Sequence, residues 1–493
     1  MSDDVVESSS ETSEYPGNPD TGADNPEVPN LERTSVQSLL RSVSRFTEFS
    51  MVTGEAAREE EKDGDGEIVH AHKTAPDDTP KEGFWARSNQ NLRLDLLRQW
   101  IIIILILATY IFAVFSIYWG SMYRRDSRLV NLKVLVVVEN DRAGEITSTI
   151  LKTIDSPSVK PLAGWTVRNY TSEQQVINLV HTEKYWGSIY VTGSNVSEEL
   201  IADFQNGSSL NTSTLIRSYY ESARDPVGIS SYTKPALLQA GEVFRTIWQT
   251  QVYPKILANL SSDQLIALKN SSLLATIPEI QYTDGNPVTS PILTAPLQVG
   301  LLYLVIISFF QIMWFMKING TVANMVKPVS YILYRVILIQ ANCLILSLAY
   351  TCLNRAFQID LQRSWTGGFA VLWMVSYLAM SACAGAGENV VLICTATIPP
   401  LAGFWVLFFI ILNISATFSP IELCPEVYRF AYAMPIKNAY ELMKMVFLNT
   451  YRGSLGRYIG VLVAWLVVNS LLFPFCLLFF ASRMKKRVEK GGR

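Results

Sequence analysis

The sequence of 493 residues has few of the residues, and none of the short motifs, from which enzyme sites are usually built. It contains three histidines and no H-E-x-x-H, C-x-x-C or G-x-S-x-G sequence, so zinc, dithiol and serine-nucleophile sites of these kinds are not predicted. The G-x-x-x-x-G-K-[ST] loop that holds nucleotide phosphates is also missing. We predict a protein that is not an enzyme, has no cofactor or metal site and does not hydrolyse ATP itself. We predict no nucleic-acid partner.

Cysteine is missing from residues 120–296, because all six cysteines lie later, at positions 343, 352, 383, 394, 424 and 476. This region therefore has no disulfide framework, and its own apolar core must stabilise it. Cys352 and Cys424 fall near predicted outer helix ends and could pair. Two separate thiols in apolar surroundings are the interpretation that we favour.

Charged residues are missing from long apolar intervals, for example between Arg98 and Arg124. A helix needs about 20 apolar residues to cross a bilayer, because backbone polar groups find no other partners in hydrocarbon. The sequence predicts an α-helical membrane protein with six transmembrane helices. They are Gln99–Trp119, Leu297–Met316, Tyr331–Cys352, Phe369–Gly387, Val391–Thr417 and Tyr458–Ser482.

Six spans place both termini on one side of the membrane. The basic tail, residues 483–493, together with Lys317 and Lys327, marks that side as cytosolic by the positive-inside rule. Region 120–296 carries six N-x-[ST] sequons, where average composition gives about one or two. We predict glycosylation on the lumenal or external side at Asn169, Asn195, Asn206, Asn211, Asn259 and Asn270. This topology allows several membranes of the secretory pathway, of which we favour the plasma membrane.

The two polar regions of the chain differ in their apolar patterning. Residues 1–97 are predicted to be a disordered acidic cytosolic tail, because runs such as 59–65 bury too little apolar area to offset chain entropy. Residues 120–296 contain the β-branched run Leu132–Val138 and then alternating helix and strand patterns. We predict an α/β extracytosolic domain with a small βαβαβ layer, inserted between helices 1 and 2. His181 falls on a predicted amphipathic helix, where we expect a structural role.

Ionisable side chains inside membrane spans mark function, because burying them in lipid is costly. Arg335 lies about one turn into the third span, and Glu388 falls at the predicted cytosolic turn between spans four and five. Either could take part in gating or packing, but we expect each to be an interfacial anchor. The pattern therefore disfavours a proton-coupled antiporter.

Prolines interrupt the second half of the membrane domain, residues 297–482. Pro399 and Pro400 should kink the fifth span or separate a short segment from it. Residues 418–445 are too polar to cross the membrane and too apolar for a free loop, and predict an outer re-entrant element of short broken helices along the outer leaflet. Its prolines, Pro420, Pro425 and Pro435, are assigned a role in gating or packing.

Four short motifs follow one another between residues 100 and 483. They are Tyr118–Ser121, the strand Leu132–Asp141 that ends in Glu139-Asn140-Asp141, Glu183–Trp186 and Ala295–Tyr303. On these motifs the chain resembles the fungal nitrosoguanidine-resistance family of multispanning membrane proteins. It resembles, more distantly, phage-infection-type proteins and type-2 ABC exporter membrane domains, with one span, a large external domain and five further spans. The resemblance implies a role in resistance to toxic alkylating compounds at a fungal membrane, and implies no catalytic or metal residues.

Our leading hypothesis is a membrane-integral resistance protein that acts on or excludes small amphipathic toxicants or lipids, exporter-like but without its own ATPase. Its expected partners are membrane lipids, amphipathic small molecules, and a second copy or another membrane protein, since six spans form half of a pathway in the exporter plan. The alternative is a glycosylated membrane scaffold or regulator that recruits partners. A membrane subunit that uses a separate ATPase is a third hypothesis.

Overall fold

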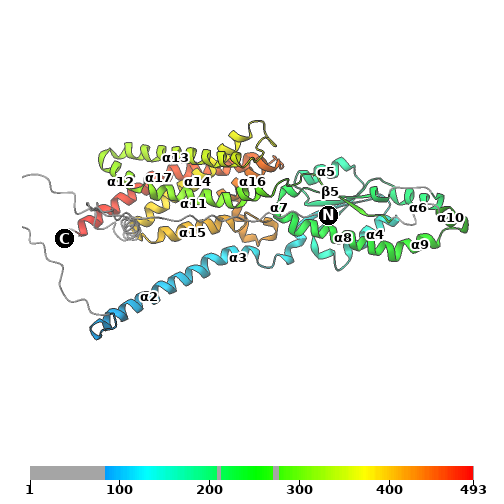
Figure 1. Cartoon of the computed structure of the whole chain (residues 1–493), viewed down its shortest axis with the longest axis horizontal. Coiled ribbons are helices and arrows are strands. Elements are labelled where there is room, and N and C mark those ends of the chain that lie inside the picture. The colour runs from blue at the N-terminus through cyan, green and yellow to red at the C-terminus, as the bar shows by residue number, and fades with distance from the viewer. Residues whose placement is uncertain (1–83, 208–211, 270–276, 492–493) are drawn as a thin grey trace, which may run out of the picture. The chain divides into compact units, whose positions relative to one another are not determined.

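The computed structural model describes residues 84–207, 212–269 and 277–491 (Figure 1). Most of the tail predicted to be disordered, and the sequons at Asn211 and Asn270, lie outside the described residues. The chain divides into two units, residues 1–90 and 91–493. In the first unit, the described residues form the short helix η1 (Arg87–Asn89) and the first residue of α2.

A five-stranded sheet lies in the sequence between the first two apolar helices. Its strands are β1 (Lys133–Val138), β2 (Gly164–Asn169), β3 (Gly187–Val191), β4 (Ile216–Tyr220) and β5 (Ile280–Asp284). Their order is β2-β1-β3-β4-β5, with β1 parallel to β2 and β3, β3 antiparallel to β4, and β4 parallel to β5. Helices α4 (Glu145–Asp155) and α5 (Glu173–His181) connect the three parallel strands. These elements match the predicted βαβαβ layer.

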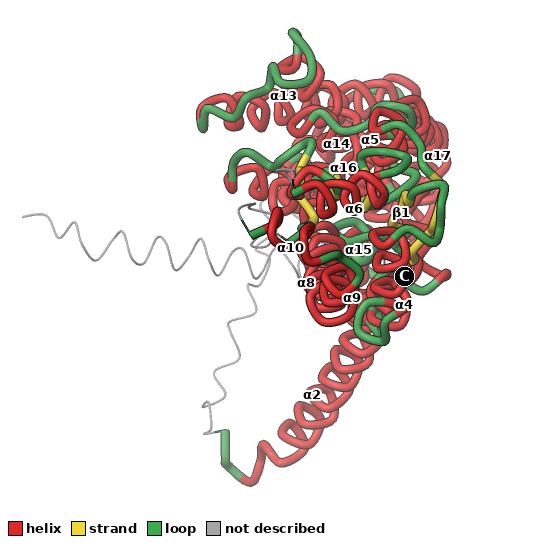
Figure 2. Tube along the Cα trace, turned by 90° about the vertical axis from the view of Figure 1, so that its right-hand side faces the viewer, coloured by secondary structure: helices red, strands yellow, loops and turns green. Residues whose placement is uncertain are grey.

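Helices cover both faces of the sheet, and Figure 2 shows the strands among them. The remaining helices of this domain are α6 (Val196–Asn206), α7 (Pro226–Gly228), α8 (Lys234–Ile247), α9 (Tyr253–Ala258) and α10 (Ser262–Leu268). Successive side chains of a strand point to opposite faces. Val134, Val136 and Val138 accordingly pack with α4, α6 and α8, whereas Leu135 and Val137 pack with α5. This apolar core forms without disulfides, because all six cysteines of the chain are free thiols, and the Cys352–Cys424 pair is not formed.

Five helices among the described residues are long and apolar enough to cross a membrane. They are Arg87–Met122, which contains α2 (Gln90–Tyr110) and α3 (Ser116–Met122); Pro291–Trp314, which ends in α11 (Leu301–Trp314); α13 (Pro328–Ala356); α14 (Gly368–Thr397); and Leu455–Lys486 of α17 (Leu455–Gly491). A further helix, α12 (Met316–Met325), follows α11. The five correspond to five of the six predicted spans.

The boundaries predicted for the fifth span, Val391–Thr417, are wrong. Residues 391–397 continue α14, and a separate helix of 14 residues, α15 (Leu401–Ile414), begins after Pro399 and Pro400. Proline has no N–H group and disfavours helical geometry in the residue before it, which explains the break. Glu388 therefore lies inside a 30-residue helix and not in the predicted turn.

The directions of the helices before and after α15 indicate how often the chain crosses the membrane. Just before α17, Arg452 donates a hydrogen bond to the carbonyl of Ser364, just before α14. Further along both helices, Asn389 of α14 bonds the carbonyl of Asn469 in α17 at 3.0 Å. The two helices therefore run in the same direction, and the chain between them must return along the bundle. α15 is the helix on that return path, although at about 1.5 Å per residue it is shorter than the roughly 30 Å hydrocarbon layer. Six crossings stay a prediction.

The predicted outer element consists of broken helices, as expected, but most of its last helix is enclosed by protein. Its parts are η12 (Ile421–Leu423), η13 (Glu426–Ala433) and α16 (Pro435–Leu448). Pro420 and Pro425 precede the first two parts, and Pro435 is the first residue of the third, a position that tolerates the missing N–H group. All residues of α16 except Glu441 are buried. That this element lies along the outer leaflet stays a prediction.

Candidate functional site

Open α/β sheets bind ligands at the carboxyl ends of their parallel strands, where the strand order reverses. In this sheet the position after β1 is filled by Glu139, whose side chain is buried. Its carboxylate accepts hydrogen bonds from Thr147 Oγ1 at 2.9 Å and from the backbone N and Oγ of Ser197, both at 2.5 Å. These partners lie in the first turns of α4 and α6, where a negative charge is stabilising. The protein's own carboxylate thus fills this place, and we assign no ligand site there.

Two buried ionisable residues contact each other in the membrane domain, residues 297–482, which is called the membrane half below. Arg335 of α13 is 7% exposed and Glu388 of α14 is 2% exposed, and they form an ion pair between Nη2 and Oε1. Nη1 of Arg335 also bonds the hydroxyl of Tyr331 at 2.9 Å, and the ring of Phe473 lies 5.8 Å from the guanidinium. The prediction that Arg335 and Glu388 are separate interfacial anchors is wrong, because the sequence does not show that they face each other.

An apolar cavity of about 350 Å³ lies beside this ion pair. Its walls come from α11, α12, α13, α14 and α17, and besides Arg335 and Glu388 its polar lining is limited to Asn319, Tyr331 and Thr395. Gly320 of α12 also lines it, and a side chain added at that glycine would meet open space. A small number of polar groups in an otherwise apolar pocket is typical of ligand sites. Except for Val326, all its lining residues belong to the apolar helices or to α12.

A second polar site lies where the sheet domain meets the membrane half. Arg224 donates hydrogen bonds from Nη1 to the carbonyl of Tyr185 at 2.6 Å and from Nη2 to the carbonyl of Glu183 at 3.0 Å. Its guanidinium lies 4.0 Å from the ring centre of Trp186, within the range of a cation–π interaction. Glu183 adopts a left-handed backbone conformation, with φ of 61°. The Glu183–Trp186 motif therefore forms a clamp on Arg224.

The helix α16 supplies a buried charge cluster to the same junction. Glu441 forms ion pairs with Lys437 at 3.0 Å and with Lys444 at 2.7 Å, and Lys444 also donates a 2.6 Å hydrogen bond to the carbonyl of Arg224. Burial by itself raises the pKa of Glu441, but the two lysines outweigh it and lower the pKa to about 2. Burial likewise lowers the pKa of Lys437, and Glu441 more than reverses this effect. Both groups are therefore charged at neutral pH. Sequence reasoning missed this cluster, although its spacing of i, i+4 and i+7 is visible in the sequence.

A polar cavity of about 180 Å³ lies between the clamp and this cluster. Four carboxylates and four cations line it, together with Pro420 and aromatic residues from the outer element and α17. The charged residues are Glu183, Asp225, Glu422 and Glu441, and Arg224, Lys437, Lys444 and Arg457. Burial raises the pKa of Glu183, and the nearby Lys444 and Arg224 offset part of this rise.

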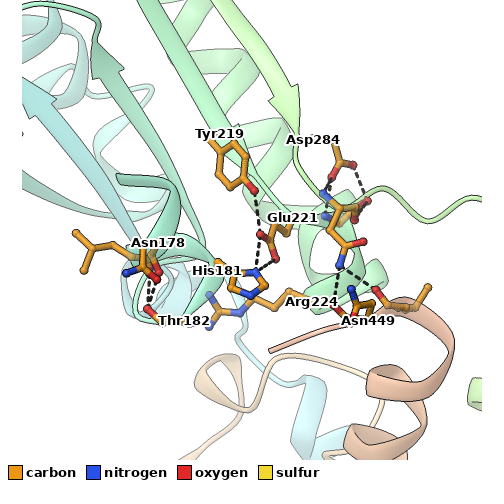
Figure 3. Close-up of polar contacts among 12 residues, drawn as sticks. Asn178, His181, Thr182, Tyr219, Glu221, Arg224, Asp284 and Asn449 are labelled. Carbon is orange, nitrogen blue, oxygen red and sulfur yellow. Dashed lines mark hydrogen bonds and ion pairs between the residues drawn. The ribbon is translucent and has the colours of Figure 1, made fainter. Parts of the chain in front are cut away.

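Hydrogen bonds at the neighbouring edge of the sheet hold the two halves together (Figure 3). Glu221, after β4, accepts a 2.9 Å hydrogen bond from Tyr219 and lies 3.0 Å from Nδ1 of His181. The ring of His181 contacts Tyr451, in the loop before α17, edge to face. Asn286 donates from Nδ2 to the carbonyls of Leu448, the last residue of α16, and of Asn449, the residue that follows it. The end of α16 and the loop before α17 are therefore both tied to the sheet domain.

The other predicted site residues are placed as follows. The four described sequon asparagines are exposed: Asn169, Asn195, Asn206 and Asn259. Exposure is compatible with a glycan, and glycosylation itself stays a prediction. Pro420 lines the polar cavity, whereas Pro425 lines a separate surface cleft next to Arg128 and Arg429. A gating role for these prolines, for Arg335 or for Glu388 stays a prediction.

The comparisons with known proteins agree with a membrane protein whose chemistry is not established. A family model described as a protein of unknown function, DUF3533, matches residues 103–471. The chain belongs to the DUF3533 family. The uncharacterized endoplasmic reticulum membrane protein YJR015W of Saccharomyces cerevisiae is 28% identical to this chain over 474 residues. The aligned residues cover 89% of this chain and 93% of the yeast protein. No solved structure matches.

The DUF3533 match covers the first apolar helix from residue 103 onward, the sheet domain and most of the membrane half, so these parts belong to one family architecture. An integral membrane protein is consistent with the relative's name and with the apolar helices. Neither description mentions nitrosoguanidine resistance or an ABC exporter. The resemblances to the nitrosoguanidine-resistance family and to ABC exporters therefore stay hypotheses.

Proposed function

We propose that this protein binds amphipathic molecules of the membrane, lipids or toxicants with a polar group, in the apolar cavity beside Arg335 and Glu388, and moves or excludes them. The observation that carries the proposal is the buried ion pair at the wall of that cavity. A charged pair within membrane helices is costly and is most often found where a substrate path requires it. The apolar walls suit a hydrocarbon chain, and the ion pair suits its polar group.

The proposal requires no ATPase within the chain, and the sequence has no phosphate-binding loop of the usual kind. The molecule would then move down its own gradient. We further propose six crossings with both termini in the cytosol. The sheet domain would then lie in the lumen or outside the cell. The compartment in this proposal is the secretory pathway, where the plasma membrane is our sequence-based expectation and the name of the yeast relative points to the endoplasmic reticulum.

Reconstituted protein tests this function directly. Full-length protein in liposomes should speed the transfer of a fluorescent phospholipid between leaflets over protein-free liposomes. Gly320→Leu places a side chain in the cavity, where nothing lies within 4 Å of an added Cβ, and should slow the transfer about tenfold. Gly403→Leu is the matched control, because Gly403 of α15 is also surrounded by open space but does not line the cavity. Its transfer rate should equal that of the wild type.

Two outcomes would contradict the proposal. The first is a wild-type rate equal to that of protein-free liposomes for both the phospholipid and an amphipathic alkylating compound. If another protein also co-purifies stably with this one, this outcome would favour the alternative hypothesis of a membrane scaffold. The second is an unchanged rate in Gly320→Leu, which would place any transfer path outside the cavity.

A further inference from the structure

The polar cavity at the junction of the sheet domain and the membrane half contains three charged groups that form no ion pair with any residue that the structure describes. Most of its eight charged residues have internal partners. Glu441 pairs with Lys437 and Lys444, and Arg224 is held by two carbonyls and Trp186. Asp225 accepts a 2.7 Å hydrogen bond from the backbone N of Gly228 and so caps α7.

The remaining three charges are Glu183, Glu422 and Arg457. Among the residues that the structure describes, none of the three has an ion-pair partner. Both carboxylates are only partly exposed, and both belong to the lining of the cavity. Arg457 is exposed at the start of α17, with its guanidinium over the rings of Tyr432 and Tyr458 at 5.5 and 4.9 Å. Arg224 and Lys444 act on Glu183 through space, and Arg224 and Lys437 act in the same way on Glu422. Each carboxylate therefore lacks a direct cationic contact, which would stabilise its charge where it is partly buried.

We propose that this cavity binds a small zwitterion, whose ammonium group lies at Glu183 and Glu422 and whose anionic group lies at Arg457. The volume of about 180 Å³ is below the roughly 300–1,000 Å³ of pockets that enclose drug-sized ligands, so the cavity suits a group of the size of a lipid headgroup. The fixed cluster on α16 and the clamp on Arg224 keep the walls of the cavity in place.

Two sources offer this chemistry: the ammonium-phosphate headgroup of a phospholipid, and a free soluble zwitterion. The cavity is lined by the first turn of the candidate membrane helix α17 and by the outer element, so a headgroup can reach it. The inference concerns a different cavity from the one beside Arg335 and Glu388, and it does not depend on lipid transfer.

Binding to the full-length protein in detergent tests the proposal, with free phosphoethanolamine as the soluble probe. Nanodiscs with and without phosphatidylethanolamine provide the lipid arm, read by the shift in thermal unfolding. We expect binding in at least one arm. Glu183→Gln, Glu422→Gln and Arg457→Gln should each weaken it about tenfold, the size expected for loss of one charge-assisted contact. Glu199→Gln and Arg142→Gln, at exposed positions of the sheet domain, are the matched controls and should bind like the wild type.

The two arms identify the source, and three outcomes overturn the proposal. Binding of free phosphoethanolamine with no shift in the phosphatidylethanolamine nanodiscs assigns a soluble zwitterion, and a shift in those nanodiscs assigns the lipid headgroup. No binding in either arm, with the wild type folded, would contradict the site. Equally tight binding of ethanolamine alone or inorganic phosphate alone would contradict the zwitterion. Unchanged binding in all three variants would place the ligand elsewhere.

Discussion

Glu441→Gln should destabilise the protein by about 3–5 kcal/mol, the usual cost of removing one partner from a buried ion pair. The change leaves the ammonium groups of Lys437 and Lys444 buried without their carboxylate. The readout is thermal unfolding of the purified full-length protein in one detergent. Glu426→Gln is the matched control, because Glu426 lies in the same outer element but its ion pair with Arg429 is exposed. That control should change stability by less than about 1 kcal/mol.

The same cluster predicts how stability depends on pH. The pKa of Glu441 is about 2 in the folded protein and 4.5 ordinarily, so the unfolded chain binds this proton more readily. Glu441 therefore contributes stability above about pH 4.5, and this contribution of about 3 kcal/mol is lost as the pH falls from 4.5 towards 2. Comparing wild type and Glu441→Gln from pH 7 to pH 3 isolates it. Equal losses of stability in the two proteins over this range would show that the cluster is not ionised as we describe.

Removing one partner of the intramembrane ion pair should have an effect of similar size. Glu388→Gln leaves the guanidinium of Arg335 buried without a counter-charge, which costs about 3–5 kcal/mol. Replacing both residues together, Arg335→Met with Glu388→Met, should recover that loss, because well-packed apolar residues can replace a buried pair at little cost. The double variant should nevertheless transfer lipid about tenfold more slowly, if the pair has a role beyond packing.

This pair of measurements separates structure from function. Thermal unfolding reports the packing role, and lipid transfer in liposomes reports the proposed activity. Arg355→Met is the control for loss of an arginine from the same helix, because Arg355 is exposed near the other end of α13. A double variant with full stability and wild-type transfer would reduce Arg335 and Glu388 to packing residues.

Hydropathy and local patterning predicted much of the fold, because lipid and water impose strong constraints on local sequence. Five of six predicted spans correspond to candidate membrane helices, and the run Leu132–Val138 indicated the central strand β1. The predicted boundaries of the fifth span were wrong for an equally local reason. The apolar stretch continues across Pro399 and Pro400, so hydropathy alone does not show that residues 391–397 extend α14. The double proline indicated a break but not which helix would gain those residues.

The sites depend on contacts between distant residues, which local patterns do not encode. Arg335 and Glu388 are 53 residues apart, and each by itself is typical of an interfacial anchor. Glu441 is different, because its lysines lie on one helical face and sequence reasoning could have found them. The hydrogen bond from this cluster to the carbonyl of Arg224, more than 200 residues earlier, could be found only from the structure. The Glu183–Trp186 motif carried the family resemblance without indicating that it holds an arginine.

The most direct test of the central claim is to locate a photoactivatable phospholipid on the full-length protein in nanodiscs by mass spectrometry. We expect crosslinks on cavity residues such as Ala323 and Leu478. Gly320→Leu should abolish these crosslinks without changing those at Phe112, which is 79% exposed on the first apolar helix. Crosslinks at Phe112 with none at Ala323 or Leu478 in the wild type would contradict an amphipath site beside Arg335 and Glu388.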